Sequence, residues 1–296
     1  MRRGVLSAAL RAAAVAALSL AAALGCRGEH RVRIGSKNFT EQVILGEMAA
    51  QALEAEGVRV DRRLDLGGTF VCHRALLAGE LDLYPEYTGT AYTAILRQKP
   101  VSDPARVRTD VAQEYARKFG LVWTAPLGFE NTFALVMRSA QARELSITKI
   151  SDLARFGDRL RPGFGYEFLE RADGFPGLAA AYGLKFVARP VEMDLGLLYA
   201  ALAQEKVDVV AGNSTDGLIA ALHLTVLEDD RRYFPPYEAA FVVRSEAWRN
   251  PAVRRALESL AGRISADAMR AMNAAVDRDK RRPEDVAREF LSARKR

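Results

Sequence analysis

Short apolar runs alternate with helix-forming segments along most of this 296-residue chain, and this alternation constrains the fold more than any other feature. Strands are expected at 32–35 and 58–64, with a helix between them. Because a strand, a helix and a second strand at this spacing form a parallel pair, the pattern predicts an α/β fold with helices on both faces of its sheet. A second block, with expected strands at 133–138, 185–188 and 207–210, repeats this rhythm without repeating the sequence.

The first 25 residues have the composition of a secretory signal peptide. Arg2 and Arg3 precede an apolar run at 5–24, and this run leads into Cys26. A basic start, an apolar core and a small residue before the cut are typical of such a signal. The ending resembles a bacterial lipobox, so we expect Cys26 to be lipidated and to become the mature N-terminus, the alternative being a cut elsewhere by the ordinary peptidase. The mature protein is then periplasmic or otherwise extracytoplasmic, and a lipid anchor tethers it to the membrane.

Charge and cysteine content argue against several classes of function. The net charge of +6 falls to +3 once residues 1–25, with three arginines and no acid, are removed, and the remaining basic residues are scattered among acids. We therefore predict no nucleic-acid binding. Cys72 lies on the apolar side of an expected helix, which favours a buried side chain over a nucleophile. The three histidines lack metal-ligand spacing, and no nucleotide or hydrolase motif is found, so we predict a binding protein without a cofactor rather than an enzyme.

The segment 82–90 is the strongest candidate for a binding site. It places two tyrosines and two threonines within seven residues, directly after an apolar run that is expected to be a strand. Ligand sites of open α/β sheets lie at the carboxyl ends of strands. Ring faces attract cations, and hydroxyl groups at the start of a helix can hold an anion, so a small zwitterion would use both. The alternative is a proline turn whose tyrosines are ordinary core residues.

Several segments together resemble the substrate-binding proteins of osmoprotectant ABC importers, the ProX/OpuBC type, which take up glycine betaine, choline and related quaternary amines. They run in the family's order along nearly the whole mature chain, at 34–42, 66–69, 82–90, 128–133, 167–174, 213–217, 227–230 and 234–237.

The resemblance implies a type II periplasmic-binding-protein fold, in which two α/β lobes are joined by two crossing segments and the ligand lies in the cleft between them. The crossings are expected near Asn131 and Pro235, with residues 30–131 and 236–296 in lobe one and residues 132–235 in lobe two. Such a receptor closes over its ligand, delivers it to a membrane permease and makes or breaks no bond. Receptors of this type are usually monomers.

The resemblance also implies which residues bind the ligand. It places the carboxylate of a betaine against Lys37, Thr90 and Arg171. Lysine supplies a point charge and arginine a fork of donors that suits a carboxylate. The alternative for the two basic residues is a surface ion pair with Glu41 or Glu167.

The aromatic cage expected around the quaternary ammonium is incomplete in this sequence. Tyr87 and Tyr237 match two walls of the family's cage, whereas Phe133 and Asn213 stand where betaine binders usually carry tyrosine. An amide in the site favours a ligand with further polar groups, such as carnitine or ergothioneine, unless Asn213 only marks the start of a helix. Another aromatic residue could complete a cage for glycine betaine, the candidates being Tyr84, Phe129 and Tyr166.

Two further functions are compatible with the same fold. A sensory receptor would bind a similar ligand and signal to a partner without transport. An enzyme would need a nucleophile or a cofactor-attachment residue in the cleft, and Cys72 is the only candidate for that role.

Overall fold

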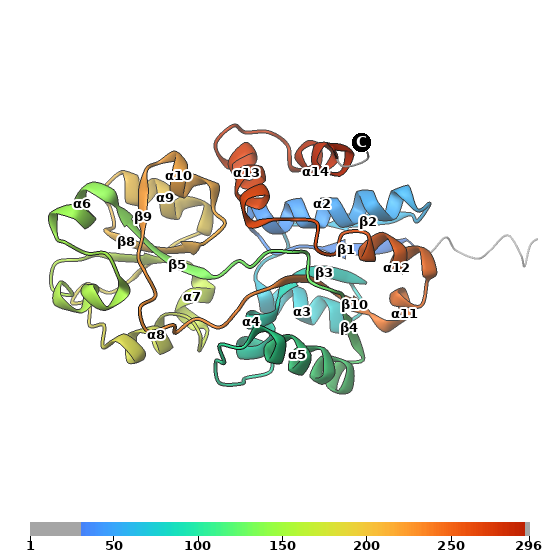
Figure 1. The fold of residues 1–296 in the computed structure, drawn as a ribbon, viewed down its shortest axis with the longest axis horizontal. Coiled ribbons are helices and arrows are strands. Elements are labelled where there is room, and N and C mark those ends of the chain that lie inside the picture. The colour runs from blue at the N-terminus through green and yellow to red at the C-terminus, as the bar shows by residue number, and fades with distance from the viewer. Residues whose placement is uncertain (1–30, 294–296) are drawn as a thin grey trace, which may run out of the picture.

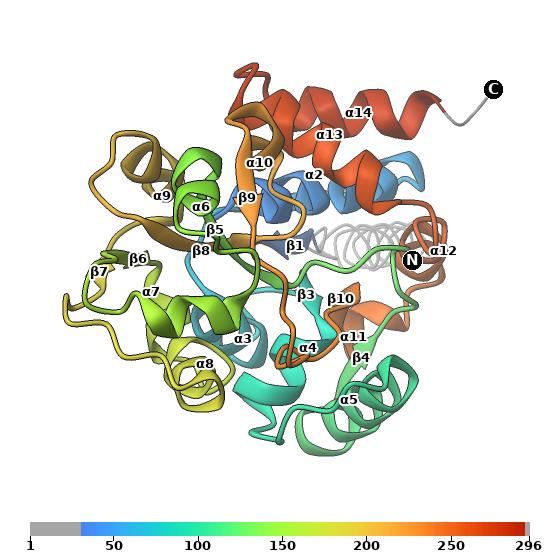
Figure 2. The same ribbon diagram turned by 60° about the vertical axis from the view of Figure 1, so that its left-hand side comes forward.

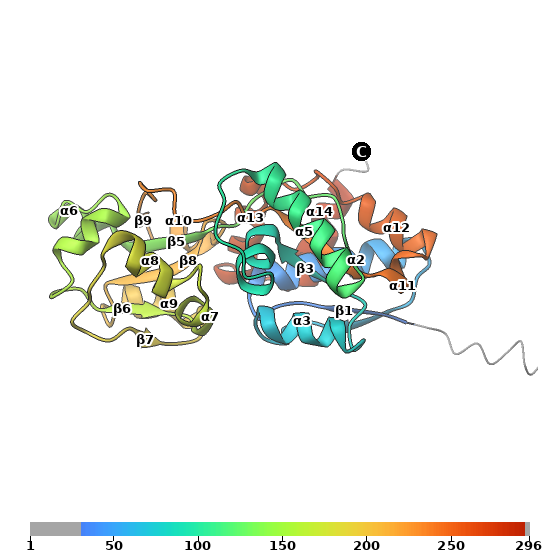
Figure 3. The same cartoon turned by 90° about the horizontal axis from the view of Figure 1, so that it is seen from below.

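The computed structural model describes residues 31–293, which form two α/β lobes that lie side by side (Figures 1 and 3). The predicted signal peptide at 1–25 and the predicted lipidation site at Cys26 lie outside the described residues. Among residues 31–293, no helix is long and apolar enough to cross a membrane.

The first sheet has five strands in the order β2-β1-β3-β10-β4. The strands are β1 (Val32–Gly35), β2 (Val60–Arg63), β3 (Leu83–Tyr87), β4 (Leu121–Trp123) and β10 (Ala239–Arg244). β1 is parallel to β2 and β3, as the strand-helix-strand spacing predicts. β10 is antiparallel to both of its neighbours, and the chain enters this strand only after it has built the other lobe.

The second sheet also has five strands, in the order β7-β6-β8-β5-β9. The strands are β5 (Phe133–Arg138), β6 (Pro162–Phe164), β7 (Val191–Glu192), β8 (Val209–Asn213) and β9 (Leu224–Val226). β6, β7 and β8 are parallel, and β5 is antiparallel to β8 and β9. The strand expected at 185–188 is absent from the described chain, and β7 begins three residues later.

Helices cover both sheets. The first lobe contains α2 (Thr40–Ala55), α3 (Thr69–Leu77), α4 (Thr88–Thr90), the π-helix η1 (Ala91–Ile95), α5 (Pro104–Phe119), α11 (Ser245–Trp248), α12 (Pro251–Glu258), α13 (Ala266–Asp277) and α14 (Pro283–Ala293). The second lobe contains α6 (Ser139–Glu144), the 3-10 helix η2 (Ile150–Arg155), α7 (Tyr166–Glu170), α8 (Phe175–Tyr182), α9 (Leu195–Ala203) and α10 (Gly217–Ala221).

The ends of α5 show how local sequence sets these elements. The side chain of Asp103 accepts hydrogen bonds from the backbone N–H groups of Ala105 and Arg106, and Pro104 occupies the first turn, where a missing N–H has no cost. Gly120 ends the helix with a φ of 64°, a left-handed conformation that favours glycine.

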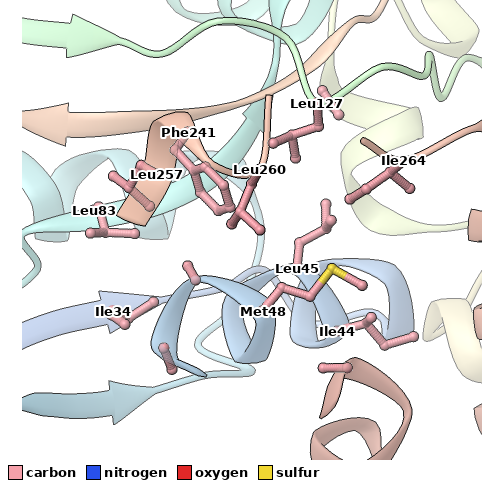
Figure 4. Close-up of a cluster of buried hydrophobic side chains, with 14 of the residues drawn as sticks. Ile34, Ile44, Leu45, Met48, Leu83, Leu127, Phe241, Leu257, Leu260 and Ile264 are labelled. Carbon is pink, nitrogen blue, oxygen red and sulfur yellow. The ribbon is translucent and has the colours of Figure 1, made fainter. Parts of the chain in front are cut away.

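The largest hydrophobic core lies between α2 and the first sheet (Figure 4). Ile44, Leu45 and Met48 of α2 pack towards Ile34 and Phe241 of the sheet, and all five side chains are fully buried. The C-terminal helices α12, α13 and α14 also pack against α2 (Figure 2). This core fixes the carboxyl ends of β1 and β3, from which the candidate site is built.

Two connections join the lobes, one between β4 and β5 and the other between β9 and β10. They run antiparallel to each other: the N–H of Asn131 donates to the carbonyl oxygen of Tyr237 at 3.1 Å, and Glu130 forms a bridge with Glu238. Asn131 and Pro235, where we expect the crossings, lie within these connections. The chain therefore passes between the lobes twice at one place, which leaves a cleft beside the paired connections.

Candidate functional site

A cavity of about 840 Å³ lies between the two lobes. All seven residues that the sequence predicts as ligand contacts line it, namely Lys37, Tyr87, Thr90, Phe133, Arg171, Asn213 and Tyr237. Four of them belong to the first lobe or to its connection, namely Lys37, Tyr87, Thr90 and Tyr237, and the other three belong to the second lobe.

The topology explains why these residues meet. Lys37 follows β1 and Tyr87 is the last residue of β3, and the carboxyl ends of these parallel strands lie at one edge of the first sheet. In the second sheet, Phe133 at the start of β5 pairs directly with Asn213 at the end of the antiparallel β8. The two sheet edges face the same cavity, so each lobe contributes one side of the site.

Three aromatic rings form the walls that the sequence predicts. Phe133 and Tyr237 lie with their ring centroids 5.9 Å apart in an edge-to-face arrangement. The hydroxyl group of Tyr237 donates to Asp173 at 2.7 Å, and that of Tyr87 donates to Glu41 at 2.6 Å. Both tyrosines are therefore held in place by buried carboxylates.

Three phenylalanines that the sequence reasoning missed also line the cavity, namely Phe39, Phe168 and the partly exposed Phe70. Phe39 stacks against Tyr87 with ring centroids 6.4 Å apart, and Phe168 and Phe133 pack edge to face with ring centroids 4.9 Å apart. Phe39 and Phe168 lie within segments that carry the family resemblance, at 34–42 and 167–174. Their place in these segments was the sequence signal that could have identified them as cavity residues.

Of the residues considered as additional walls, only one reaches the cavity. Tyr84 and Phe129 are core residues of the first lobe and do not line it. Tyr166 does line it, and its 59% exposure shows that it lies at the open side. Phe39 and Phe168 thus supply the extra aromatic surface instead.

Lys37 is buried and already has partners. Its ammonium group lies 2.5 Å from a carboxylate oxygen of Glu86 and 3.0 Å from the hydroxyl oxygen of Thr69, and it sits 5.0 Å from the centroid of the Tyr87 ring. Glu86, and not Glu41, is its ion-pair partner, so the alternative of a surface ion pair is wrong for this residue. The pair leaves the region near neutral while fixing the amine against the aromatic wall.

Arg171 is held in the same way by Asp173. Two nitrogens of its guanidinium donate to the two carboxylate oxygens at 2.9 and 2.5 Å, and the group lies 5.0 Å from the centroid of the Phe133 ring. Burial opposes the charge of Arg171, but the carboxylate beside it outweighs this effect and raises its pKa. Burial also acts to raise the pKa of Asp173, and the guanidinium outweighs it and lowers that pKa.

Contacts across the cleft join the lobes in this structure. Arg171 of the second lobe donates to the hydroxyl oxygen of Thr90 at 3.2 Å. The backbone N–H of Thr69, in the first turn of α3, donates to Glu167, and the hydroxyl group of Thr69 donates to the same carboxylate at 3.0 Å. A carboxylate is favoured at a helix N-terminus, so Glu167 stabilises the approach of the two lobes.

Asn213 is oriented by Asp216. Its backbone N–H donates to one oxygen of that carboxylate at 2.8 Å, and its side-chain nitrogen lies 3.5 Å from the other. Tyr199 donates to the same carboxylate at 2.5 Å. Burial raises the pKa of Asp216 to about 6. Because Asn213 ends β8 and α10 begins four residues later, the interpretation of Asn213 as a helix start is wrong.

Cys72, the candidate nucleophile of an enzyme on this fold, is a buried core residue in the described part of the chain. No group of histidine, cysteine and acidic side chains in residues 31–293 could hold a metal ion. Cys72 is fully buried on α3, where its thiol contacts the carbonyl oxygen of Ser36 at 3.4 Å. Burial raises the pKa of this thiol to about 12, which disfavours the thiolate form that a nucleophile needs.

The cavity between two sheets, with its aromatic and paired ionic lining, agrees with what sequence comparison finds. Residues 30–293 match the family model OpuAC, the substrate binding domain of ABC-type glycine betaine transport system. The chain belongs to the OpuAC family. This is a family of transport substrate-binding proteins and not of enzymes, and substrate-binding proteins of ABC importers are extracytoplasmic.

Curated relatives and solved structures support this assignment. A glycine-betaine-binding protein of Pseudomonas aeruginosa is 36% identical over 91% of this chain and 89% of its own length. The ergothioneine transport permease/ergothioneine binding protein EgtU of Helicobacter pylori is 35% identical over 87% of this chain, and this OpuAC-family chain spans only 46% of EgtU. A crystal structure of a glycine betaine/carnitine/choline ABC transporter superposes with a TM-score of 0.72 at 33% identity, covering 88% of this chain and 98% of the other.

Proposed function

We propose that this chain is the solute receptor of an ABC importer and that it binds a betaine-like quaternary amine in the interlobe cavity. The observation that carries the proposal is the convergence of Tyr87, Phe133 and Tyr237 on one cavity in a member of the OpuAC family. Relatives at 36% and 35% identity are named for glycine betaine and ergothioneine, and both ligands carry a trimethylammonium group.

The aromatic lining suits such a head group for a physical reason. A trimethylammonium group has no N–H to donate, so ring faces and dispersion must hold it. Each cation–π contact contributes about 0.5–2 kcal/mol, and several rings are needed for micromolar affinity. Phe39 and Phe168 add surface to the three predicted rings, which offsets the loss of a tyrosine at Asn213.

The carboxylate of the ligand would bind near Arg171 and Thr90. Arg171 uses two of its nitrogens on Asp173, while its remaining terminal nitrogen lies 3.8 Å from Glu167. That nitrogen and the hydroxyl group of Thr90 are the donors left for an anion. Lys37 would contribute mainly by supporting the Tyr87 wall, because its amine is bonded to Glu86 and Thr69 and lies against the Tyr87 ring.

Asn213 favours a ligand with a hydrogen-bond donor of its own. One N–H of its side chain faces Asp216, so the amide oxygen and the second N–H are left for a ligand, and the oxygen can only accept. Glycine betaine has no donor for this oxygen, whereas the hydroxyl group of carnitine and the ring N–H of ergothioneine could supply one. We therefore propose that ligands of the second kind bind more tightly.

The remaining features of the receptor follow from the same proposal. Cys26 would carry the lipid anchor after removal of residues 1–25, and the protein would work as a monomer with an ABC permease. Residues 30–131 and 236–296 would move as lobe one, residues 132–235 as lobe two, and hinge motion at the paired connections would open the cleft.

Calorimetric titration with glycine betaine, L-carnitine and ergothioneine tests the proposal. We expect saturable micromolar binding of at least one of them, weakened at least about tenfold by Tyr87→Ala. Tyr92→Ala is the matched control, since Tyr92 is equally buried in the same lobe, at 4% exposure, but does not line the cavity. Absence of binding by all three, or equal losses in the two variants, would contradict the proposed site.

A further inference from the structure

Glu41 is a buried carboxylate that none of the ligand contacts described above includes. It is the second residue of α2, it does not itself line the cavity, and only 2% of its surface is exposed. Four side-chain donors surround it, from Tyr87, Asn131, Thr215 and Asn273. Burial raises the pKa of Glu41, and the four hydrogen bonds oppose that rise.

The two oxygens of this carboxylate bind different parts of the molecule. Oε1 accepts from the Tyr87 hydroxyl group at 2.6 Å and from the Asn131 side chain at 2.8 Å, so it holds a cavity wall and the first connection. Oε2 accepts from the Thr215 hydroxyl group at 2.6 Å and from the Asn273 side chain at 3.1 Å. Thr215 belongs to the second lobe, whereas Glu41 and Tyr87 belong to the first.

A second contact between the lobes, from α13 to α10, supports the same link. Helix α13 of the first lobe lies beside α10 of the second (Figure 1). The side chain of Asn273 donates to the carbonyl oxygen of Thr215 at 2.9 Å. A Cβ atom at Gly217 would lie 2.3 Å from the backbone nitrogen of Ala274, so the two helices meet where only glycine fits. The position of Thr215 is thus tied to the relative placement of the lobes.

We propose that Glu41 is a positioning residue that fixes the Tyr87 wall of the cavity and couples it, through Thr215, to the closure of the second lobe. A change in lobe position moves the Thr215 hydroxyl group and therefore disturbs the carboxylate that holds Tyr87. Conversely, a ligand seated against Tyr87 favours the arrangement in which all four donors reach the carboxylate. Loss of one donor leaves a buried charge incompletely hydrogen-bonded, which is costly and makes the link strong.

The binding arm of the test rests on the proposed function and uses a double-mutant cycle. Tyr87→Phe removes the donor to Oε1 but keeps the ring, and Thr215→Val removes the donor to Oε2 although Thr215 does not line the cavity. We expect each single change to weaken binding of glycine betaine, L-carnitine or ergothioneine. The loss of affinity in the double variant should be smaller than the product of the two single losses by a factor of about two or more. Thr225→Val, which removes a hydroxyl group bonded to Ser139 elsewhere in the second lobe, is the control.

The second arm needs no ligand. In the unliganded protein, Glu41→Gln should speed amide hydrogen exchange both around Tyr87 and at residues 213–217, while α5 exchanges as in the wild type. Multiplicative losses in the cycle, or unchanged exchange in either lobe of a folded Glu41→Gln protein, would overturn the inference. If the wild type binds none of the three ligands, the proposed ligand class fails, and the exchange measurement alone decides the role of Glu41.

Discussion

Replacement of Asp173 by asparagine should destabilise the protein more than any change to its many surface ion pairs. Asp173 and Arg171 are 1% and 4% exposed, and two hydrogen bonds join their charged groups. Asparagine keeps the shape but removes the charge, so the guanidinium would stay buried without its counterion. Tyr237 also loses a carboxylate acceptor for its hydroxyl group.

The expected cost follows from the burial of the pair. Removal of one partner from a buried ion pair costs about 3–5 kcal/mol, because the other charge remains desolvated. The amide oxygen of the asparagine can still accept one hydrogen bond from Arg171, and a carboxylate oxygen of Glu167 lies 3.8 Å from the guanidinium group. The lower end of this range therefore applies. A loss of about 3 kcal/mol corresponds to a Tm roughly 6–12 °C lower for a protein of this size.

Thermal and urea unfolding at several pH values would measure this cost. The pKa of Asp173 is lowered in the folded protein, so its contribution is present above the unfolded pKa of about 3.9 and is lost as the pH falls through the folded value. The difference between the wild type and Asp173→Asn should thus be constant from pH 8 to about 5 and shrink below about 4.

An exposed pair of the same geometry provides the control. Arg278 donates to both oxygens of Asp279 at 2.6 and 2.8 Å on the surface, and Asp279→Asn should leave the Tm unchanged within error. If Asp173→Asn proved as stable as Asp279→Asn at pH 7, the argument that this buried pair holds the site together would be refuted.

Three further changes test other parts of the account. Glu167→Gln weakens the contact with Thr69 across the cleft. We therefore expect a larger radius of gyration of the unliganded protein in small-angle X-ray scattering. An unchanged radius would show that this contact does not hold the lobes together. Burial lowers the pKa of His73 to about 4, so protonation of this residue favours unfolding as the pH falls from about 6.5 to 4. The Tm of His73→Gln should therefore fall less than that of the wild type over this pH range. Equal decreases in Tm would exclude His73 as the cause. Gly217→Ala forces its Cβ against Ala274 and should cost about 1–3 kcal/mol in urea unfolding, and a neutral result would mean that α10 and α13 separate freely.

Only part of the cavity lining could be predicted from local pattern. Tyr87 and Thr90 lie in the segment that ends and follows an expected strand, where α/β sheets present ligand sites. The other five residues could be assigned only through the resemblance to osmoprotectant-binding proteins, namely Lys37, Phe133, Arg171, Asn213 and Tyr237. The antiparallel strands β5 and β10 could not be predicted in this way. Their direction depends on the path by which the chain enters each sheet, and periodicity carries no information on such a path.

The ion-pair partners of Lys37 and Arg171 also could not be predicted from the local sequence pattern. Lys37 pairs with Glu86, 49 residues away, because β1 and β3 are neighbours in the sheet. Arg171 pairs with Asp173 because the chain breaks between α7 and α8, where a continuous helix would have separated the two side chains. Such pairings depend on the packed geometry of side chains, which a single sequence does not display.

The most direct test of the proposed cage is a paired calorimetric titration. Glycine betaine, L-carnitine and ergothioneine would each be compared with the isostere in which carbon replaces the ammonium nitrogen, so that shape is kept and the positive charge is lost. We predict that at least one of the three quaternary amines binds with micromolar affinity and that its isostere binds at least about tenfold more weakly. Equal affinity for the members of each pair, or no binding by any of the three amines, would contradict the account.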